Sequence, residues 1–266
     1  MTTARPYVSS LRRMSLLDSL LTEANRSLQV LANVAHASRP NPADAAPRAL
    51  TYSGTTKPDT TASNTSATSG MVNTPEAPPP APALPAPVMA SASAEPGPAD
   101  VRHSRGLMRV NHVGEICAQA LYRGQAVGTI DPRTRALFLK AAEEEVDHLV
   151  WLNQRLRELE GRTSLLNPLW YAGSFFLGWA ASRAGESFNL GFMAETEKQV
   201  TAHLENHLRK LPASDVRSRR ILEQMKIDEA NHQKTAEHSG ATELPLPVRA
   251  AMRAMSKVMT TTAYWI

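Results

Sequence analysis

Apolar residues recur every three or four positions through most of the C-terminal part of this chain, which is the spacing of one face of an α-helix. The pattern predicts helices at 104–129, 132–161, 186–211, 214–238 and 246–260, and a short amphipathic helix at 15–33. Asp131 and Pro132 form a helix start, and Gly240 marks a helix end. Strand-like alternation never extends beyond a few positions. We therefore predict an all-α fold, a four-helix bundle with additional short helices.

Two of these helices place an acid and a histidine where the apolar stripe calls for hydrophobic side chains. Glu145 and His148 interrupt a stripe made by Leu137, Ala141, Leu152, Leu156 and Leu159. Glu229 and His232 interrupt a second stripe, made by Leu222, Met225 and Ala236. One Glu-x-x-His pair on a helix is a weak signal, because charged residues usually lie on a solvated face. Two such pairs, both within apolar stripes, indicate a polar site inside the bundle.

The other two long helices each add one inward-facing acid. Glu115 is the only charge on a face shared with Met108, Asn111, Ala118, Tyr122 and Ala126. Glu197 lies in a stripe made by Leu190, Met193, Val200, Leu204, Leu208 and Leu211. Glu195 lies two residues before Glu197, roughly 200° around the helix, so we expect it to face solvent. The same reasoning places three acids of the second helix outside the core: Glu143, Glu144 and Asp147.

These inward-facing residues form an internal repeat, in which a lone Glu precedes a Glu-x-x-His pair by 30 residues in one half and 32 in the other. A four-helix bundle brings the halves face to face and produces the ligand set typical of ferritin-like di-iron and di-manganese carboxylate proteins. Four buried carboxylates are costly without compensation, and two divalent cations would balance their charge. The predicted metal ligands are Glu115, Glu145, His148, Glu197, Glu229 and His232. No catalytic residue beyond these ligands is assigned.

Several neighbours of the ligands have predicted roles other than metal binding. Asp228 either orients a ligand histidine from across the bundle or faces solvent. His112 and His203 are interpreted as hydrogen-bonded histidines near the site rather than ligands. Cys117 is interpreted as a small buried hydrophobe, and Tyr122 as a residue that lines a cavity above the metals. A zinc protease is excluded, since no His-Glu-x-x-His sequence occurs.

The N-terminal part of the chain has a different composition. Thirteen of the 19 prolines fall within 38–101, where Tyr52 is the only aromatic residue, so this stretch is predicted to be a disordered linker. We expect a leading segment with a short helix at 1–37, the linker at 38–101, and a helical domain that holds the metal site at 102–266. We interpret the first 13 residues first as an over-long start before Met14, with a transit peptide, which they resemble in composition, as the alternative.

The net charge of the chain and one uncharged stretch indicate which kinds of partner it binds. The 29 Lys and Arg exceed the 25 Asp and Glu only slightly, and no nucleic-acid-binding motif is present, so we expect a membrane surface rather than nucleic acid as a partner. A single cysteine excludes a disulfide framework and fits a reducing compartment. Residues 163–182 carry no charge and include Trp170, Tyr171 and Trp179. We interpret them first as a helix in the membrane interface, with core or partner packing and a membrane span as alternatives.

Five stretches at these residues closely resemble the demethoxyubiquinone hydroxylase family of ubiquinone biosynthesis: LMRVNHVGEICAQALYRGQ, EEEVDHLVWL, GFMAETEKQVTAHL, MKIDEANHQKTA and KVMTTTAYWI. The resemblance covers about 102–266, and 14–37 also look like the leading helix of bacterial members. The stretch at 38–101 is longer than we would expect of the family. All six predicted ligand positions hold the residue type that the family has there. The resemblance therefore implies a ferritin-like bundle with two bound iron ions, so that residues 102–266 would form a di-iron hydroxylase domain.

The activity that this resemblance implies is hydroxylation of a polyprenyl methoxy-methyl-benzoquinol, demethoxyubiquinol, by dioxygen. Reducing equivalents would come from NADH or from the quinol itself. The resemblance also implies a peripheral inner-membrane protein that works beside other ubiquinone-biosynthesis proteins. Its location would be the cytoplasmic side of the cell inner membrane or, alternatively, the matrix side of the mitochondrial inner membrane. The stretch at 163–182 would then be the membrane-docking element and the quinone entrance.

Other interpretations stay open at this point. A ferritin- or rubrerythrin-like protein that handles iron or peroxide has the same ligand set, although it would not need apolar access to the site. A lipid-binding scaffold with structural metals is a non-enzymatic alternative. The ligands suit manganese as well as iron. The sequence is also compatible with a homo-oligomer.

Overall fold

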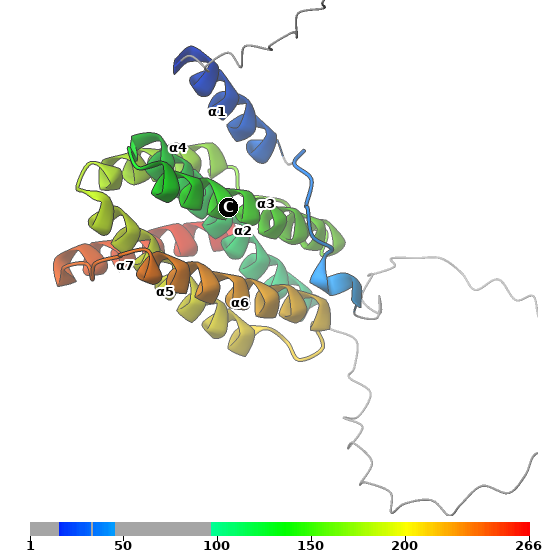
Figure 1. Cartoon of the computed structure of the whole chain (residues 1–266). Helices are drawn as coiled ribbons and strands as arrows, with labels where there is room; N and C mark the ends of the chain where they lie inside the picture. Colours follow the sequence, from blue (N-terminus) through cyan, green and yellow to red (C-terminus); the bar gives the residue numbers. More distant parts are fainter. Residues whose placement is uncertain (1–15, 33, 46–96) are drawn as a thin grey trace, which may run out of the picture.

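The structure, a computed structural model, describes residues 16–32, 34–45 and 97–266. Within these ranges the chain is helical and forms no strand, so the predicted all-α fold is confirmed (Figure 1). The elements are α1 (Leu16–Leu31), the short 3-10 helix η1 (Pro42–Ala45), α2 (Pro98–Gly128), α3 (Pro132–Glu158), α4 (Asn167–Ser182), α5 (Glu186–Lys210), α6 (Val216–His238) and α7 (Leu246–Trp265).

Helices α2, α3, α5 and α6 form the four-helix bundle, as two hairpins that pack against each other (Figure 1). Short turns make each hairpin antiparallel. Asp131 accepts a hydrogen bond from the Thr134 amide at 2.7 Å and caps α3, and Asp215 does the same for α6 through the Ser218 amide at 3.0 Å. Helix α4 carries the chain from the first hairpin to the second, which is the long crossover connection of ferritin-like bundles.

The bundle interior has a polar layer between two apolar layers. One apolar cluster includes Tyr122, Phe138, Leu190 and Met193, with parts of all four bundle helices. The other contains Met108, Trp151, Leu152, Leu156, Leu204, Leu222 and Met225. The predicted ligands lie between these clusters along each helix. Apolar packing on both sides therefore excludes water and holds the four helices rigidly around the polar layer.

Helix α4 corresponds to the uncharged stretch and packs along α2. The two backbones meet at glycines: a Cβ atom at Gly178 would lie 2.1 Å from the Leu121 carbonyl oxygen, and one at Gly124 would lie 2.0 Å from the Phe175 carbonyl oxygen. One side of α4 thus packs against the bundle, while its other side is exposed. No helix among the described residues has the length and apolar character needed to cross a membrane.

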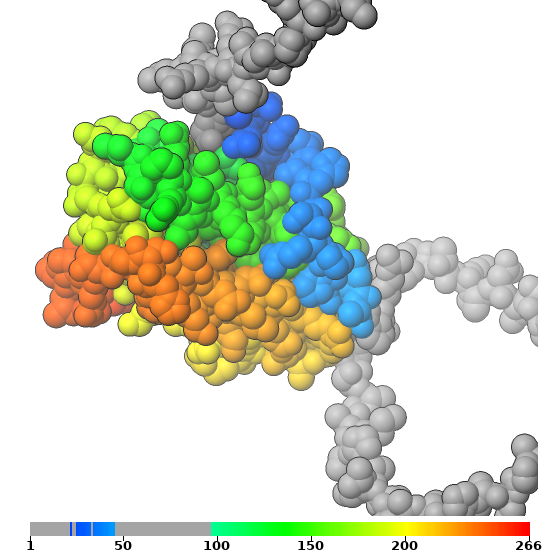
Figure 2. Space-filling view, viewed as in Figure 1, coloured from blue at the N-terminus to red at the C-terminus, as the bar shows by residue number. Residues whose placement is uncertain are grey.

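The predicted linker boundary at residue 38 is wrong. Residues 34–45, which we call the docked segment, lie over α3 and α6 (Figure 2). Ala43 is fully buried, and Arg217 of α6 donates a hydrogen bond to its carbonyl oxygen at 2.9 Å. Helix α2 also begins earlier than predicted, because Pro98 is favourable in a first helical turn. The rest of the predicted linker, residues 46–96, and the transit-peptide-like first 13 residues lie outside the described ranges.

Candidate metal centre

The six predicted ligands meet at the centre of the bundle, and each is at most 7% exposed. Helix α2 provides Glu115 and α5 provides Glu197, while α3 and α6 each provide a Glu-x-x-His pair. The helical phase derived from the apolar stripes is therefore correct for all six residues: Glu115, Glu145, His148, Glu197, Glu229 and His232.

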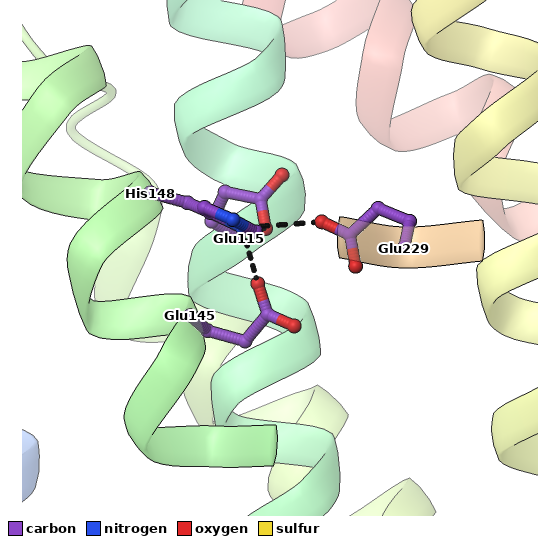
Figure 3. Close-up of side chains that lie close together, drawn as sticks. All are labelled: Glu115, Glu145, His148 and Glu229. Carbon is purple, nitrogen blue, oxygen red and sulfur yellow. Dashed lines mark hydrogen bonds and ion pairs between the residues drawn. The ribbon is translucent and has the colours of Figure 1, made fainter. Parts of the chain in front are cut away.

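The ligand atoms form two overlapping groups, and within each group they lie within 4.8 Å of one another. Glu115 and His148 belong to the first group, which Figure 3 shows. Glu197 and His232 belong to the second. Glu145 and Glu229 belong to both groups. This is the arrangement that two cations require when two carboxylates lie between them and each ion has its own carboxylate and imidazole.

Both histidines point Nδ1 at the carboxylates. His148 Nδ1 lies 2.9 Å from Glu145 Oε2 and 3.1 Å from Glu229 Oε1. His232 Nδ1 lies 3.1 Å from Glu229 Oε2 and 3.4 Å from Glu145 Oε1. The Nε2 atom of each ring faces away from the cluster. Each of two cations would therefore meet one ring nitrogen, His148 Nδ1 from the first hairpin or His232 Nδ1 from the second.

Each Nε2 atom has a carboxylate partner from the opposite hairpin. His148 Nε2 lies 3.0 Å from Asp228, and His232 Nε2 lies 2.6 Å from Glu144. These outer carboxylates directly precede the Glu of each Glu-x-x-His pair, so the contact is exchanged symmetrically between α3 and α6. Such a partner fixes the Nε2–H tautomer and leaves the Nδ1 lone pair for a metal. The predicted contact between Asp228 and a histidine across the bundle is confirmed, and the prediction that Glu144 points only to solvent is wrong.

Two other acids also differ from the prediction. Asp147 is buried, because the docked segment covers its side of α3 and Ser38 donates its backbone amide to Asp147 Oδ1 at 2.6 Å. Glu195 is 9% exposed rather than solvated, because α7 lies over this part of α5 and brings Arg253 to 3.9 Å. Neither acid belongs to the metal-ligand groups. Glu143 is exposed, as predicted.

The structure also places the four remaining residues for which the sequence predicted a role. Tyr122 is buried and donates a hydrogen bond to Glu197 Oε1. His112 is fully buried with no hydrogen-bond partner for either ring nitrogen, so its predicted hydrogen bond is wrong; burial lowers its pKa to about 4. The ring of His203 packs against that of His207 at a tilt of 55°, and its Nε2 atom also has no hydrogen-bond partner. Cys117 is half-buried, and burial raises its pKa to about 11.

Burial and mutual repulsion shape the protonation of the cluster. Burial raises the pKa of Glu115 well above its usual range, and the charge of Glu145 raises it further. Burial raises the pKa of Glu197 to about 8, with a contribution from Glu229. Burial lowers the pKa of His148, but the surrounding carboxylates outweigh it and hold this pKa well above its usual range. The four carboxylates thus need positive charge, which protons or cations supply.

The residues fit a pair of divalent metal ions. One oxygen atom of each of Glu145, Glu197 and Glu229 is buried and makes no hydrogen bond. Buried polar atoms nearly always have a partner, and the protein atoms nearest to the Glu229 and Glu145 oxygens are the two Nδ1 atoms, which are themselves metal-ligating atoms. A metal ion would satisfy both kinds of atom. Carboxylate oxygens together with imidazole nitrogens suit iron and manganese, and two dications would match four carboxylates in charge.

Comparison with known proteins identifies the family of the chain. Residues 102–263 match the family described as "Ubiquinone biosynthesis protein COQ7". The chain is 52% identical to a 3-demethoxyubiquinol 3-hydroxylase of Bordetella pertussis over 255 residues, which is 96% of this chain and 95% of that protein. A protein of the same name from Bordetella avium is 53% identical over 96% of this chain and 98% of its own length. One from Ralstonia pickettii is 47% identical over 94% of this chain and its whole length.

These matches bear on one further expectation. Because they extend over 94–96% of the chain, most of the stretch at 38–101 lies within the length that these three relatives share, whereas two other relatives match over only 172 and 183 residues. The family match begins where the bundle begins and includes all six residues of the cluster. The chain belongs to the COQ7 family of ubiquinone-biosynthesis proteins.

Proposed function

We propose that this protein hydroxylates 3-demethoxyubiquinol in ubiquinone biosynthesis, using two iron ions and dioxygen. The observation that carries the proposal is the pair of overlapping Glu and His groups, with two shared carboxylates, in a chain whose relatives carry this activity in their names. One oxygen atom would enter a ring C–H bond, and the other would leave as water. The two electrons and two protons that this requires would come from NADH or from the quinol.

The ligands divide into shared and separate roles. Glu145 and Glu229 would bind both ions, Glu115 and His148 one ion, and Glu197 and His232 the other. When bound, the iron pair would supply the redox chemistry that activates dioxygen for attack on the ring. Asp228 and Glu144 hold the two imidazoles in the orientation that leaves Nδ1 free. Tyr122 donates a hydrogen bond to Glu197 and so holds that carboxylate in place.

An apolar groove beside the ligands suits the substrate. It has a volume of about 780 Å³, including its opening to solvent, and is lined by residues of α2, α4, α5 and α7, among them Leu121, Phe192 and Met252. Gly114 and Thr196 in its wall are the sequence neighbours of Glu115 and Glu197. Methionines adapt to irregular apolar shapes, which suits a polyprenyl chain. The quinol ring would therefore approach from the side of α2 and α5.

The exposed sides of α4 and α7 suit a membrane surface. Leu169, Phe176 and Trp179 of α4 are 63%, 65% and 47% exposed, and Met255 and Val258 of α7 are 59% and 62% exposed. Both helices also line the apolar groove. A surface of this kind binds lipid when its apolar side chains enter the interface. We propose a peripheral protein of the cell inner membrane, on its cytoplasmic side, that takes its quinol from the bilayer beside other proteins of the pathway.

A matched pair of variants tests the reaction. Anaerobically reduced, iron-loaded protein is mixed with a demethoxyubiquinol and exposed to oxygen, and the product is identified by mass. Glu197→Ala is expected to abolish the product, because it removes a ligand. Glu195→Ala is expected to retain it, because the Glu195 carboxylate accepts a hydrogen bond from Gln199, lies 3.9 Å from Arg253 and belongs to neither ligand group. Equal loss in both variants would contradict the ligand assignment.

Iron uptake and peroxide turnover, measured on the same protein, distinguish the proposed function from its rival. A ferritin- or rubrerythrin-like protein would oxidise iron or reduce peroxide without converting the quinol. Because the groove beside the ligands is apolar, we expect quinol conversion to exceed both of these activities. Iron uptake or peroxide turnover without a hydroxylated product would favour the rival and refute the proposal.

A further inference from the structure

The outer carboxylate of His148 has an additional partner that comes from far away in the sequence. Arg39, in the docked segment, places Nη1 2.9 Å from Asp228 Oδ2, the same oxygen that lies 3.0 Å from His148 Nε2. Its Nε atom donates to Asp147 Oδ2 at 2.7 Å. The guanidinium therefore bridges one acid of α3 and one acid of α6, on the outer side of a predicted ligand.

Arg39 is itself held in place from several sides. Its guanidinium lies over the buried Trp151 ring, with Cζ 4.9 Å from the ring centroid. Ser38 donates its backbone amide and its hydroxyl to Asp147, which keeps that acid in position under Arg39. The Asp228 side chain is held on its other oxygen as well, since Gln224 donates to Oδ1 at 3.0 Å. Figure 2 shows the docked segment lying along the boundary between α3 and α6.

The His232 half has no equivalent among the described residues. Its outer carboxylate, Glu144, is 35% exposed and has one other charged contact, Lys140 Nζ at 3.3 Å. Lys140 is 78% exposed, and such pairs contribute little fixed geometry because the lysine is flexible and solvated. The repeat therefore supplies each histidine with a carboxylate. Among the described residues, an arginine side chain holds Asp228 in place, and none holds Glu144.

We propose that Arg39 is a positioning residue that fixes Asp228 against His148 and makes the His148 side the slower of the two to release its metal ion. An outer carboxylate sets the orientation of the imidazole ligand, and disturbing it typically lowers metal affinity by about 10- to 100-fold. Arg39 acts one contact further from the metal: it removes the rotational freedom of Asp228, and Asp228 in turn orients His148. The inference rests on the proposed binding of two metal ions.

Metal release from the full-length protein tests this inference. The protein is loaded with two Co²⁺ ions, and their release into excess EDTA is followed by the absorption of the bound cobalt. The wild-type protein is expected to release its ions in a faster and a slower phase. Arg39→Gln is expected to speed the slower phase by about 10-fold and to leave the faster phase unchanged. Lys140→Ala is expected to change neither phase by more than about twofold.

Two further variants show whether Arg39 acts through Asp228. Asp228→Asn is expected to speed the same phase, and the double variant with Arg39→Gln to be no faster than Asp228→Asn alone, because both changes affect one contact. Asn41→Ala removes the hydrogen bond from the docked segment to Gln154 without touching Asp228, and is expected to leave the slower phase intact. Arg39→Lys is not expected to restore it, because one ammonium group cannot bridge two acids in this geometry.

The outcomes separate the inference from the proposed function. If the wild-type protein binds no Co²⁺, the metal centre itself is refuted. If it binds two ions but Arg39→Gln releases them at wild-type rates, the metal centre stands and the role of Arg39 is refuted. If Asn41→Ala speeds release as much as Arg39→Gln, docking of the segment rather than the guanidinium is responsible, and the inference is again refuted.

Discussion

The α2–α3 and α5–α6 hairpins each contribute two Glu and one His to the centre, yet their surroundings differ. On the α3 side, His148 is backed by an acid that Arg39 and Gln224 hold in place. On the α6 side, His232 is backed by a half-exposed acid next to a solvated lysine. Duplication therefore explains the inner ligands, while the differences arise from segments outside the repeat. The comparison predicts that variants of shared residues affect both ions, and variants of outer residues affect one.

The largest effect is expected at the shared carboxylates. Glu229→Ala removes a ligand that belongs to both groups, so the variant should purify with less than one metal ion per chain and no quinol conversion. Glu115→Ala removes a ligand of one group and should retain the ion on the His232 side. Elemental analysis of the purified proteins measures this difference, with the exposed Glu143→Ala as control. Equal metal content in Glu229→Ala and Glu115→Ala would contradict the shared role.

A smaller effect is expected at the outer carboxylates. Asp228→Asn and Glu144→Gln each weaken the hydrogen bond that orients one imidazole, which should lower the affinity of one ion by about 10- to 100-fold. The loss should be greater for Asp228, because water replaces the lost contact more readily at the more exposed Glu144. Calorimetric titration with Co²⁺ measures both. A larger loss in Glu144→Gln would reverse the proposed difference between the two halves.

The contact between α2 and α4 belongs to the first hairpin alone and concerns stability rather than metal. Gly178→Ala would push a Cβ atom against the Leu121 carbonyl oxygen and should lower the free energy of unfolding by about 1–3 kcal/mol. Gly173→Ala, on the same helix with no atom within 4 Å of the added Cβ, is the control and should be neutral or stabilising. Urea denaturation compares them; equal stabilities would mean that α4 does not pack this closely.

The smallest effect is expected from the buried histidines of the second hairpin. Burial, with the charges of His203 and Lys210, lowers the pKa of His207 to about 2. The unfolded chain takes up this proton below about pH 6.5, so the stability present above that pH is lost as pH falls. At pH 5.5 this histidine alone should cost about 1.4 kcal/mol relative to neutral pH.

His207→Gln should remove this part of the pH dependence, whereas substitution of the exposed His238 to Gln should leave it unchanged. Urea denaturation at pH 7.5 and 5.5 measures the difference. If the wild-type protein and His207→Gln lose the same stability between these two pH values, His207 is not held neutral in the folded protein.

Periodicity in the sequence was sufficient to predict the bundle and all six residues of its centre, because a helix fixes which side chains share a face. It was not sufficient for Asp147 and Arg39, whose contact joins residues 108 positions apart and depends on how a proline-rich segment packs. Glu144 is an intermediate case. It occupies the same position in its repeat as Asp228, so the internal repeat contained the information that the helical phase alone missed.

Glu195 illustrates a different limit. Its phase correctly separates it from the centre, but its exposure depends on α7, which belongs to neither hairpin. A stripe pattern within one helix reports the side that faces the bundle. It does not report which additional helix covers the opposite side, since that depends on contacts between distant segments of the chain.

Metal content and activity, determined together on one purified preparation, test the central claim most directly. We expect about two iron ions for each full-length chain, loss of demethoxyubiquinol hydroxylation when a chelator removes them, and recovery on addition of Fe²⁺ alone. Full hydroxylation by protein that contains no transition metal would contradict the account, because the inward-facing carboxylates and imidazoles would then have to be held by protein contacts alone.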